Sequence, residues 1–236
     1  MKTSLLPTHQ SAPSRPQNIQ AVIFDLDGVL MDTEWISFQV WAQIAAAYGG
    51  RLPAESYPGM IGLTAEETGE YVMRVAQVSF DLDATVARVW KTVTERINAG
   101  IEPMPGAVPL LETLAGRGYP LAIASNSPTG YIENALRGLR LRSFFRAIAG
   151  IDQVAQGKPA PDVYLRAACH LGVAPERCLA IEDSYVGSQA ALAAGMRVLA
   201  VPARQDRREK FAACFGIYPS LVEVRAGLED ALNHAA

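Results

Sequence analysis

Cysteine is scarce in this chain, with only three among 236 residues, and they stand far apart at positions 169, 178 and 214. Disulfide frameworks and structural zinc sites need closely spaced cysteines, and no CxxC pair occurs here. Histidine is as rare, and neither His170 nor His234 has an acidic partner at a telling spacing. The sequence therefore gives no sign of a disulfide-linked or zinc-binding protein.

Long apolar runs and an excess of one charge are also absent. No run approaches the roughly 18 residues of a membrane helix, and the first residues lack the apolar centre of a signal peptide. The 21 basic and 24 acidic side chains give a net charge of −3, which provides no basic surface for nucleic acid or anionic lipid. We therefore expect a cytoplasmic protein that binds neither nucleic acid nor membranes. No heptad or long apolar edge requires a partner subunit, so we also expect a monomer.

The chain does contain enough apolar residues to form a hydrophobic core. Half of its residues are hydrophobic and 19% are charged, a balance typical of globular proteins rather than disordered chains. Its length suits one large domain or a domain with an insert. Residues 1–18 hold three prolines and no apolar periodicity, so we expect them to form a disordered leader.

Five short apolar runs end at a polar residue, a glycine or a proline, as buried parallel strands do at their carboxyl ends. These runs are residues 21–24, 120–124, 147–149, 178–181 and 197–201. Helix-length segments lie between them, at residues 108–115, 131–139, 162–171 and 186–194. This alternation predicts an α/β fold with a doubly wound, Rossmann-like parallel sheet and helices on both faces.

About seventy residues interrupt the alternation after the first strand, and their pattern is helical. Apolar residues recur at helical spacing over 35–48 and 86–97, and Thr64 and Glu67 form a capping box before 71–78. A connection of this length is improbable unless it folds as a domain. We therefore predict a helical cap at residues 33–103, inserted into a catalytic core made of residues 19–32 and 104–236.

Two acidic pairs follow predicted strands. Asp25 and Asp27 precede a glycine after the first strand, a pattern that fits a turn as well as a functional site. Glu182 and Asp183 follow the fourth strand directly before a helix, where one acidic residue would suffice as an N-cap. Ligands of open α/β sheets collect at the carboxyl ends of strands, so the two pairs can converge there. Carboxylates converging at such an edge fit Mg²⁺.

Two further segments can contribute to this edge. Ser125 and Asn126 end the second strand before a helix, where hydroxyl and backbone N–H groups serve either as an N-cap or as an anion site. Lys158 lies in the segment Gly-Lys-Pro-Ala-Pro. A single lysine is usually a solvated surface residue, but the flanking prolines stiffen the backbone and make a fixed position plausible.

Together, in this order, these segments resemble the haloacid dehalogenase superfamily of phosphotransferases. The resemblance runs from about residue 20 to residue 201. The words FDLDGVLMDTE, GKPAPDVY and IEDSYVGSQAALAAGM are similar to the branch that contains β-phosphoglucomutase and small sugar-phosphate phosphatases. That branch carries a helical cap at the same point of the chain, which agrees with the insert predicted above.

The resemblance implies a role for each matching residue. Asp25 would be the nucleophile and Asp27 the general acid/base, with Ser125 and Lys158 completing the catalytic set. The phosphate-binding residues would be Gly28, Ser125, Asn126 and Lys158. The residues that hold Mg²⁺ would be Asp25, Asp27, Glu182 and Asp183. Attack by an aspartate with formation of an aspartyl-phosphate splits a difficult displacement into two easier steps, and positive charge around the phosphoryl oxygens assists both.

Several functions remain open. We expect a Mg²⁺-dependent phosphatase acting on a small phosphorylated metabolite, most readily a sugar phosphate, and the main alternative is a sugar phosphomutase. The mutase pattern has a histidine and an arginine in the cap, where this chain has Ser37 and Ala65. A carbon–halogen hydrolase would not need Asp27. A phosphoacceptor module would need no cap, and an inactive binding protein would not need the full catalytic set.

The residues that select the substrate carry no motif. Residues 59–64 of the cap, Arg74 and Lys91 are candidates for substrate contacts. Trp35, Trp41 and Trp90 stand at helical spacings, which favours a place in the cap core over a role as a platform for substrate.

Overall fold

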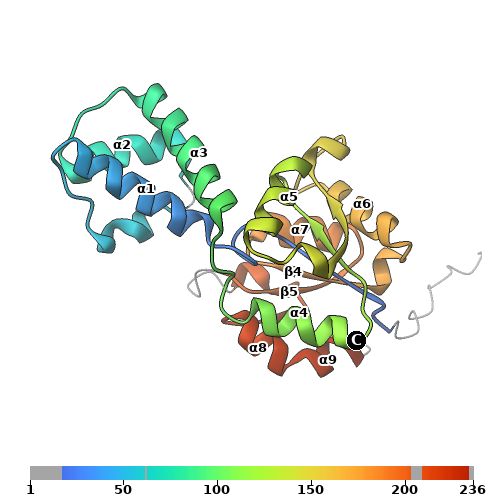
Figure 1. Ribbon diagram of the computed structural model, residues 1–236. Helices are drawn as coiled ribbons and strands as arrows, with labels where there is room; N and C mark the ends of the chain where they lie inside the picture. The colour runs from blue at the N-terminus through green and yellow to red at the C-terminus, as the bar shows by residue number, and fades with distance from the viewer. Residues whose placement is uncertain (1–17, 62, 203–208, 234–236) are drawn as a thin grey trace, which may run out of the picture.

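The computed structural model describes residues 18–61, 63–202 and 209–233. The expected leader, apart from Asn18, lies outside these residues. Figure 1 shows two parts: helices α1 to α3 on one side, and a sheet surrounded by helices on the other. In the described part of the chain, no helix is both long enough and apolar enough to cross a membrane.

The sheet contains six strands in the order β3-β2-β1-β4-β5-β6, and all neighbouring pairs are parallel. The strands are β1 Ala21–Phe24, β2 Leu121–Ala124, β3 Phe145–Ala149, β4 Cys178–Glu182, β5 Arg197–Ala200 and β6 Gly216–Ile217. The predicted doubly wound sheet is confirmed. β6 was not predicted, because its two residues are too few to form an apolar run. The direction of winding reverses between β1 and β4, and such switch points are where α/β proteins bind ligands.

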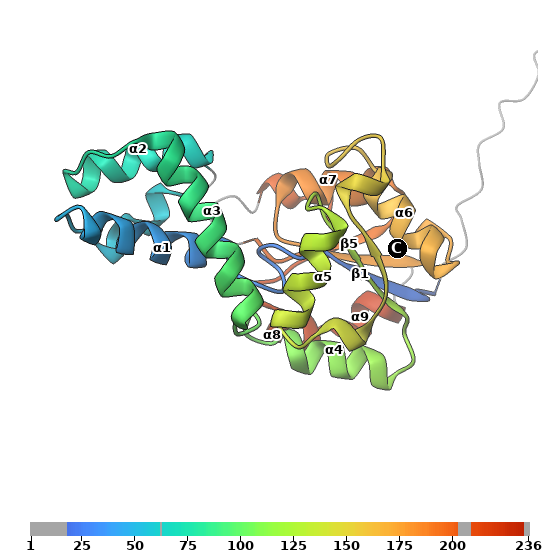
Figure 2. The ribbon, with the colours of Figure 1, turned by 45° about the horizontal axis from the view of Figure 1, so that its top comes forward.

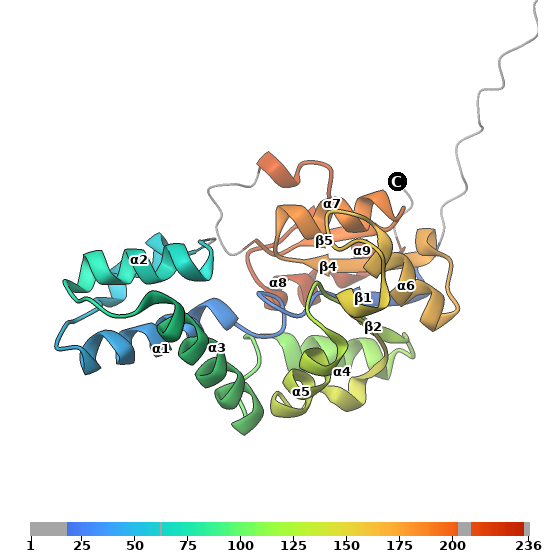
Figure 3. The same ribbon diagram turned by 90° about the horizontal axis from the view of Figure 1, so that it is seen from above.

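Helices cover both faces of the sheet (Figure 3). They are α4 Ala107–Gly116, α5 Thr129–Gly138, α6 Asp162–Leu171, α7 Tyr185–Ala193, α8 Leu221–Ala226 and α9 Leu228–Asn233. Successive side chains of β1 point to opposite faces, as strand geometry requires. Ala21 and Ile23 pack with residues of α6 and α7, whereas Val22 and Phe24 pack with residues of α4, α5, α8 and α9. The central strand is therefore buried on both sides.

The inserted helices are α1 Thr33–Ala47, α2 Ala65–Ala76 and α3 Leu82–Ala99, with a short 3₁₀ helix, η1, at Ala54–Gly59 (Figure 2). The predicted capping box at Thr64 and Glu67 is present, and α2 begins directly after Thr64. The helix α3 begins four residues before the predicted 86, because the Asp81 side chain accepts a hydrogen bond from Ala84 N and caps it. The fold therefore includes an inserted helical cap, while its domain limits at 33 and 103 stay a prediction.

The two connections between cap and core lie side by side, since Met104 N donates to Leu30 O at 2.9 Å. The end of α3 also packs on α5, where any side chain at Gly138 would collide with the Ile97 carbonyl. These contacts join the cap to the core, and residues of the cap line a cavity together with Asp27, Asn126 and Ser127, which follow β1 and β2.

The tryptophans of the cap divide between core and surface. Trp41 is buried and stacks on Phe80 at 5.9 Å between ring centres. Trp35 and Trp90 are 38% and 59% exposed. The expected place in the cap core is confirmed for Trp41 and is wrong for the other two. Trp35 packs on Phe38 and Tyr57 at the edge of the cap and stays partly open, and Trp90 lies on an exposed part of α3.

Candidate active site

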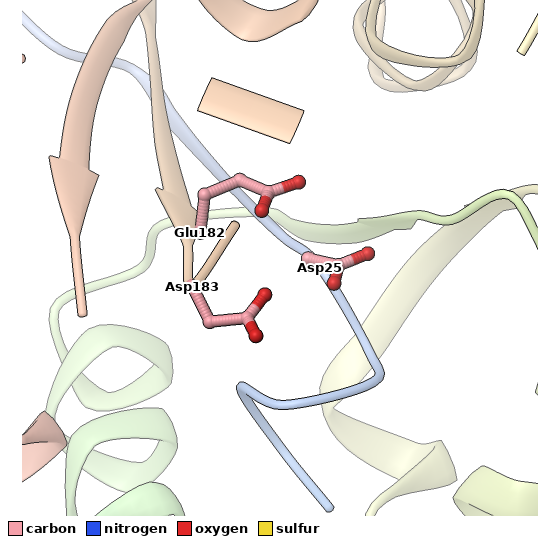
Figure 4. Close-up of side chains that lie close together, drawn as sticks. All are labelled: Asp25, Glu182 and Asp183. Atoms are coloured by element: carbon pink, nitrogen blue, oxygen red, sulfur yellow. The ribbon is translucent and has the colours of Figure 1, made fainter. Parts of the chain in front are cut away.

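The two acidic pairs meet at the switch point of the sheet. β1 and β4 are neighbours with Phe24 opposite Ile181, so the residues that follow them come together. One carboxylate oxygen from each of Asp25, Glu182 and Asp183 lies within 4.8 Å of the others. Figure 4 shows these side chains reaching from the two adjacent strand ends into one region.

Lys158 enters this cluster from the loop before α6. Its Nζ lies 2.6 Å from Asp25 Oδ1 and 2.6 Å from Glu182 Oε1, and its side chain is only 6% exposed. Burial lowers the pKa of Lys158, but the charges of Asp25 and Glu182 outweigh burial and raise the pKa above its usual value. The ammonium therefore stays charged, and the sequence prediction of a positioned lysine agrees with this geometry.

Asn126 holds the backbone of Lys158. Its Oδ1 accepts a hydrogen bond from Lys158 N at 2.8 Å, and its Nδ2 donates to Lys158 O at 3.3 Å. Both ends of the amide side chain are thus used within the protein. The structure assigns Asn126 to positioning of the lysine, while its predicted contact with phosphate stays a prediction.

Ser125 is buried at the end of β2, and its Oγ accepts a hydrogen bond from Ser127 N at 3.0 Å. A hydroxyl is both donor and acceptor, so this bond leaves the proton of Ser125 available for a phosphoryl oxygen. The location agrees with the predicted anion site at the start of α5.

Asp27 lies in the turn after β1, beside the same α5 segment. Ser127 Oγ donates to Asp27 Oδ2 at 3.2 Å. Burial raises the pKa of Asp27 above its usual value, and hydrogen bonds from Ser127, Thr33 and Tyr131 offset this only in part. Asp27 is therefore easier to protonate than a solvent-exposed aspartate, which suits a proton donor. Thr33 and Tyr131 were not foreseen, because no sequence pattern links either of them to Asp27.

Gly28 has a structural reason to be glycine. Its φ is +81°, and a side chain there would overlap the Asp183 carboxylate. Its N–H donates to Met31 O at 2.8 Å, so this amide is already used within the turn. Gly28 lets Asp183 approach the end of β1, while the predicted contact between Gly28 and phosphate stays a prediction.

Glu182 is fully occupied by hydrogen bonds from the protein. Oε1 accepts from Lys158 Nζ and from the Tyr164 hydroxyl at 2.8 Å, and Oε2 accepts from the N and Oγ of Ser184 at 3.2 and 3.0 Å. A carboxylate has about four lone-pair sites, so these bonds fill them. Among described residues only Lys158 donates to the Asp25 carboxylate, at Oδ1. Tyr164 was missed, although it is the last residue of the GKPAPDVY segment.

The charges of the cluster do not balance within the protein. Three carboxylates surround one ammonium, and burial with mutual repulsion raises the pKa of Asp25 to about 7 and that of Asp183 well above its usual value. A divalent cation would stabilise the ionised forms, and carboxylate oxygens are the donors that Mg²⁺ prefers. A cavity of about 150 Å³, lined in part by Asp27, Gly28 and Asp183, adjoins the cluster. The residues therefore fit a metal ion.

A larger cavity of about 500 Å³ lies between core and cap. Asp27, Asn126, Ser127 and the start of α5 line its core end, and residues of α1, α2, α3 and the segment between α1 and α2 line its cap end. Ser37 and Ala65, the two positions where the mutase pattern has a histidine and an arginine, both lie on its wall.

Only some of the candidate specificity residues lie at this cavity. Met60, Ile61 and Leu63 line the cavity, whereas Gly62 lies outside the described residues. Arg74 is 5.3 Å from the Tyr71 ring, and Lys91 is 3.9 Å from Glu95 on the exposed face of α3. Neither cation is among the residues that line the cavity.

Comparisons with known proteins agree with this site. Residues 22–201 match the haloacid dehalogenase-like hydrolase family. The chain is 34% identical to the protein CbbY of Rhodobacter capsulatus, covering 86% of this chain and 94% of that protein. It is 31% identical to the fructose-1-phosphate phosphatase YqaB of Escherichia coli K12, covering 74% and 92%.

A solved structure is also similar. The crystal structure of a candidate β-phosphoglucomutase from Thermotoga maritima superposes with a TM-score of 0.77 at 28% identity, covering 90% of this chain and 99% of that one. The prediction of an enzyme of the phosphoric monoester hydrolase type is confirmed by the family match together with relatives named as phosphatases. This chain belongs to the haloacid dehalogenase-like hydrolase family.

Proposed function

We propose that this chain is a Mg²⁺-dependent phosphatase that hydrolyses a small phosphorylated metabolite through an aspartyl-phosphate on Asp25. The observation that carries this proposal is the position of the Asp25 carboxylate. It lies against Lys158 Nζ at 2.6 Å, within the cluster of Glu182 and Asp183. The carboxylate that would attack phosphorus thus lies beside a positive charge that can stabilise the phosphoryl oxygens.

Mg²⁺ would be held by Asp25, Asp183 and the backbone carbonyl of Asp27. Glu182 belongs to the predicted metal set, but its filled hydrogen bonds suit it better to fixing the charge and position of Lys158. When bound, Mg²⁺ supplies positive charge that keeps the carboxylates ionised and neutralises the transferring phosphoryl group. The fit of the acidic cluster supports this cofactor.

In the first step, an Asp25 carboxylate oxygen attacks phosphorus as the bond between phosphorus and the leaving oxygen breaks. Asp27 donates its proton to that oxygen, so the leaving group departs as an alcohol. Lys158 and the Ser125 hydroxyl bind the phosphoryl oxygens through both stages. The raised pKa of Asp27 suits it to carry this proton.

In the second step, water attacks the phosphorus of the aspartyl-phosphate. Asp27, now ionised, takes a proton from that water, inorganic phosphate leaves and the Asp25 carboxylate is restored. Ser127, Thr33 and Tyr131 hold the Asp27 carboxyl through hydrogen bonds. Each substrate molecule consumes one water and yields one alcohol and one phosphate.

The relatives make sugar phosphates the first substrates to test. One is named as a phosphatase of fructose 1-phosphate and another as a phosphatase of phosphorylated carbohydrates. A phosphomutase is the second candidate, because of the similarity to a candidate β-phosphoglucomutase. Ser37 and Ala65 line the cavity without offering a cation there, which favours release of phosphate to water over return to a second position of the substrate.

The test is incubation of the purified protein with sugar monophosphates, with and without Mg²⁺. We expect inorganic phosphate to appear with Mg²⁺ and to be lost with a chelator, with no isomeric sugar phosphate accumulating. Rapid conversion of β-glucose 1-phosphate to glucose 6-phosphate with little free phosphate would establish the mutase instead. Absence of phosphate release from every monoester would refute the phosphatase.

A further inference from the structure

The large cavity has a polar end and an apolar end. Asp27, Asn126 and Ser127 line the end at the core, where the phosphoryl group would lie. The cap end is lined mainly by aliphatic and aromatic side chains, including Ile61, Leu63, Val86, Val89, Trp90 and Val93. A substrate that fills this cavity therefore carries phosphate at one end and an apolar surface at the other.

The described residues of the cavity wall offer no cation for a second anionic group. Among the described residues that line it, only Asp27 and Glu34 are charged, and both are acidic. Arg74 and Lys91 lie elsewhere on the cap. A second phosphate or a carboxylate on the leaving group would lose its water there without gaining a cation, which is unfavourable.

Trp90 is the feature of the cap end that packing does not explain. It lies on α3 and lines the cavity, yet it is 59% exposed. The aromatic pairs found within the described residues involve Trp35 and Trp41 but not Trp90. An open indole face in a binding cavity is suited to stacking with a flat ring.

The hydroxyl groups of a lone sugar would find few partners at this end. Thr33, Glu34 and Ser37 line the cavity at the start of α1 and can pair with a sugar. Beyond them the described wall is mainly apolar, with Tyr57 and Thr68 as its polar residues. A hydroxyl left without a partner costs free energy. The volume of about 500 Å³ is within the range that holds ligands larger than one sugar ring.

We propose that this cavity accepts a sugar monophosphate that bears a flat, uncharged ring system, and that its substrates are nucleoside 5′-monophosphates. The sugar lies near Thr33 and Ser37, and the base lies against Trp90. The bond between phosphorus and O5′ breaks, water adds to phosphorus, and the products are a nucleoside and inorganic phosphate. This inference rests on the proposed phosphatase function and specifies its substrate class.

The first test is a matched series in which only the group at C1 of the ribose changes. Ribose 5-phosphate, uridine 5′-monophosphate, adenosine 5′-monophosphate and ribose 1,5-bisphosphate share the same primary ester. With Mg²⁺, we expect kcat/KM for the nucleotides to exceed that for ribose 5-phosphate by about tenfold, as stacking of one base allows. Ribose 1,5-bisphosphate should be the poorest substrate for cleavage at the 5-position.

Variants locate the selectivity. Trp90→Ala should remove most of the roughly tenfold preference for nucleotides over ribose 5-phosphate, and Trp90→Phe should keep much of it. Trp35→Ala removes an exposed tryptophan outside the cavity wall and should leave the preference unchanged. Ala65→Arg adds a cation to the wall and should raise kcat/KM for the bisphosphate about tenfold relative to ribose 5-phosphate.

The outcomes separate this inference from the function beneath it. Phosphate release from none of the four compounds, while another sugar monophosphate such as fructose 1-phosphate is hydrolysed, would overturn the substrate class and leave the phosphatase standing. Release from no monoester at all would refute the phosphatase itself. Release with no preference for nucleotides, with the bisphosphate preferred, or with equal preference in wild type and Trp90→Ala would overturn the substrate class and leave the phosphatase standing. A nucleotide preference that falls in Trp90→Ala and persists in Trp35→Ala would establish it.

Discussion

Lys158 Nζ lies 2.6 Å from Asp25 Oδ1, although 133 residues separate the two in the chain. β1 presents Asp25 at the switch point of the sheet, and the side chain of Asn126 fixes the lysine backbone from the neighbouring strand end. Glu182 at the end of β4 also binds Lys158 Nζ at 2.6 Å, so three strand ends of one sheet hold the nucleophile and its cation. Their geometry depends on the core rather than on the position of the cap.

Asp25→Asn should abolish phosphate release and leave the fold intact. The amide keeps the shape of the side chain but cannot act as the nucleophile. It also removes a charge that the folded protein disfavours, since burial and the neighbouring carboxylates raise the pKa of Asp25 to about 7. The melting temperature should therefore not fall. Measurements of phosphate release and thermal unfolding would check this, with the exposed Asp83→Asn as control. Wild-type turnover in Asp25→Asn would show that Asp25 is not the nucleophile.

Asp27→Asn should slow both chemical steps, by about 10² to 10⁴ for each proton transfer. With 4-nitrophenyl phosphate the leaving group needs little protonation, so Asp27→Asn should slow the first step much less than the second. The variant should then show a burst of one 4-nitrophenol per enzyme, followed by slow turnover as the aspartyl-phosphate accumulates. Rapid-quench measurement of the burst checks this. An unchanged steady rate would take Asp27 out of the acid/base role.

The fold could be predicted because its five longer strands are almost entirely buried. Parallel strands covered on both faces appear as short apolar runs, and all five such runs became strands. β6 escaped because two residues at a sheet edge need no apolar run. The start of α3 was predicted too late because the apolar pattern begins only at residue 86, whereas the helix begins directly after its N-cap residue Asp81.

The candidate site could be predicted only as a set of residue types. Strand ends indicated that Asp25 and Asp183 meet, because topology determines that. The four hydrogen bonds that fill Glu182 could not be foreseen, since they come from a loop lysine, a helical tyrosine and the N-cap of α7, which stand 24, 18 and 2 positions away in the chain. The apolar wall of the cavity was hidden for a similar reason: Trp90 has the same sequence pattern whether it packs inward or faces a ligand.

Saturating Mg²⁺ should raise the melting temperature of the wild-type protein. A ligand at a hundredfold excess over its dissociation constant stabilises the folded state by about 2.7 kcal/mol. Asp183→Asn should weaken this response, because it removes a carboxylate of the cluster. Without metal, the variant should be at least as stable as wild type, since burial raises the pKa of Asp183 and disfavours its charge. An equal rise in melting temperature with Mg²⁺ in wild type and Asp183→Asn would mean that the ion binds elsewhere.

Asn126→Ala should lower activity by loosening Lys158. The variant loses two hydrogen bonds to the lysine backbone, each worth about 1 kcal/mol. Asn126→Asp keeps the acceptor for Lys158 N and should fall between Asn126→Ala and wild type. Because Lys158 would bind the transferring group in the proposed mechanism, kcat should fall as well as KM rise. The control is Asn134→Ala, an exposed asparagine on α5, and equal kinetics in both alanine variants would dismiss the positioning role.

Asp152 links stability to pH through the start of α5. Its Oδ1 accepts hydrogen bonds from both the N and Oγ1 of Thr129 at 2.8 Å, and these bonds lower the pKa of Asp152 from its ordinary 3.8. Thr129 is the first residue of α5, so Asp152 caps this helix from another part of the chain. The ionised carboxylate is therefore favoured in the folded state.

The sign of the pH dependence follows from that lowered pKa. The stabilisation is fully present above the ordinary pKa of 3.8 and is lost as pH falls through the lower pKa of the folded state. Asp152→Asn can still accept both hydrogen bonds but carries no charge. The free energy of unfolding of wild type should exceed that of Asp152→Asn at neutral pH, and the difference should shrink as the pH falls below the ordinary pKa of 3.8. Urea unfolding of both proteins across this range measures it, and a difference that does not change with pH would show that the charge of Asp152 contributes nothing.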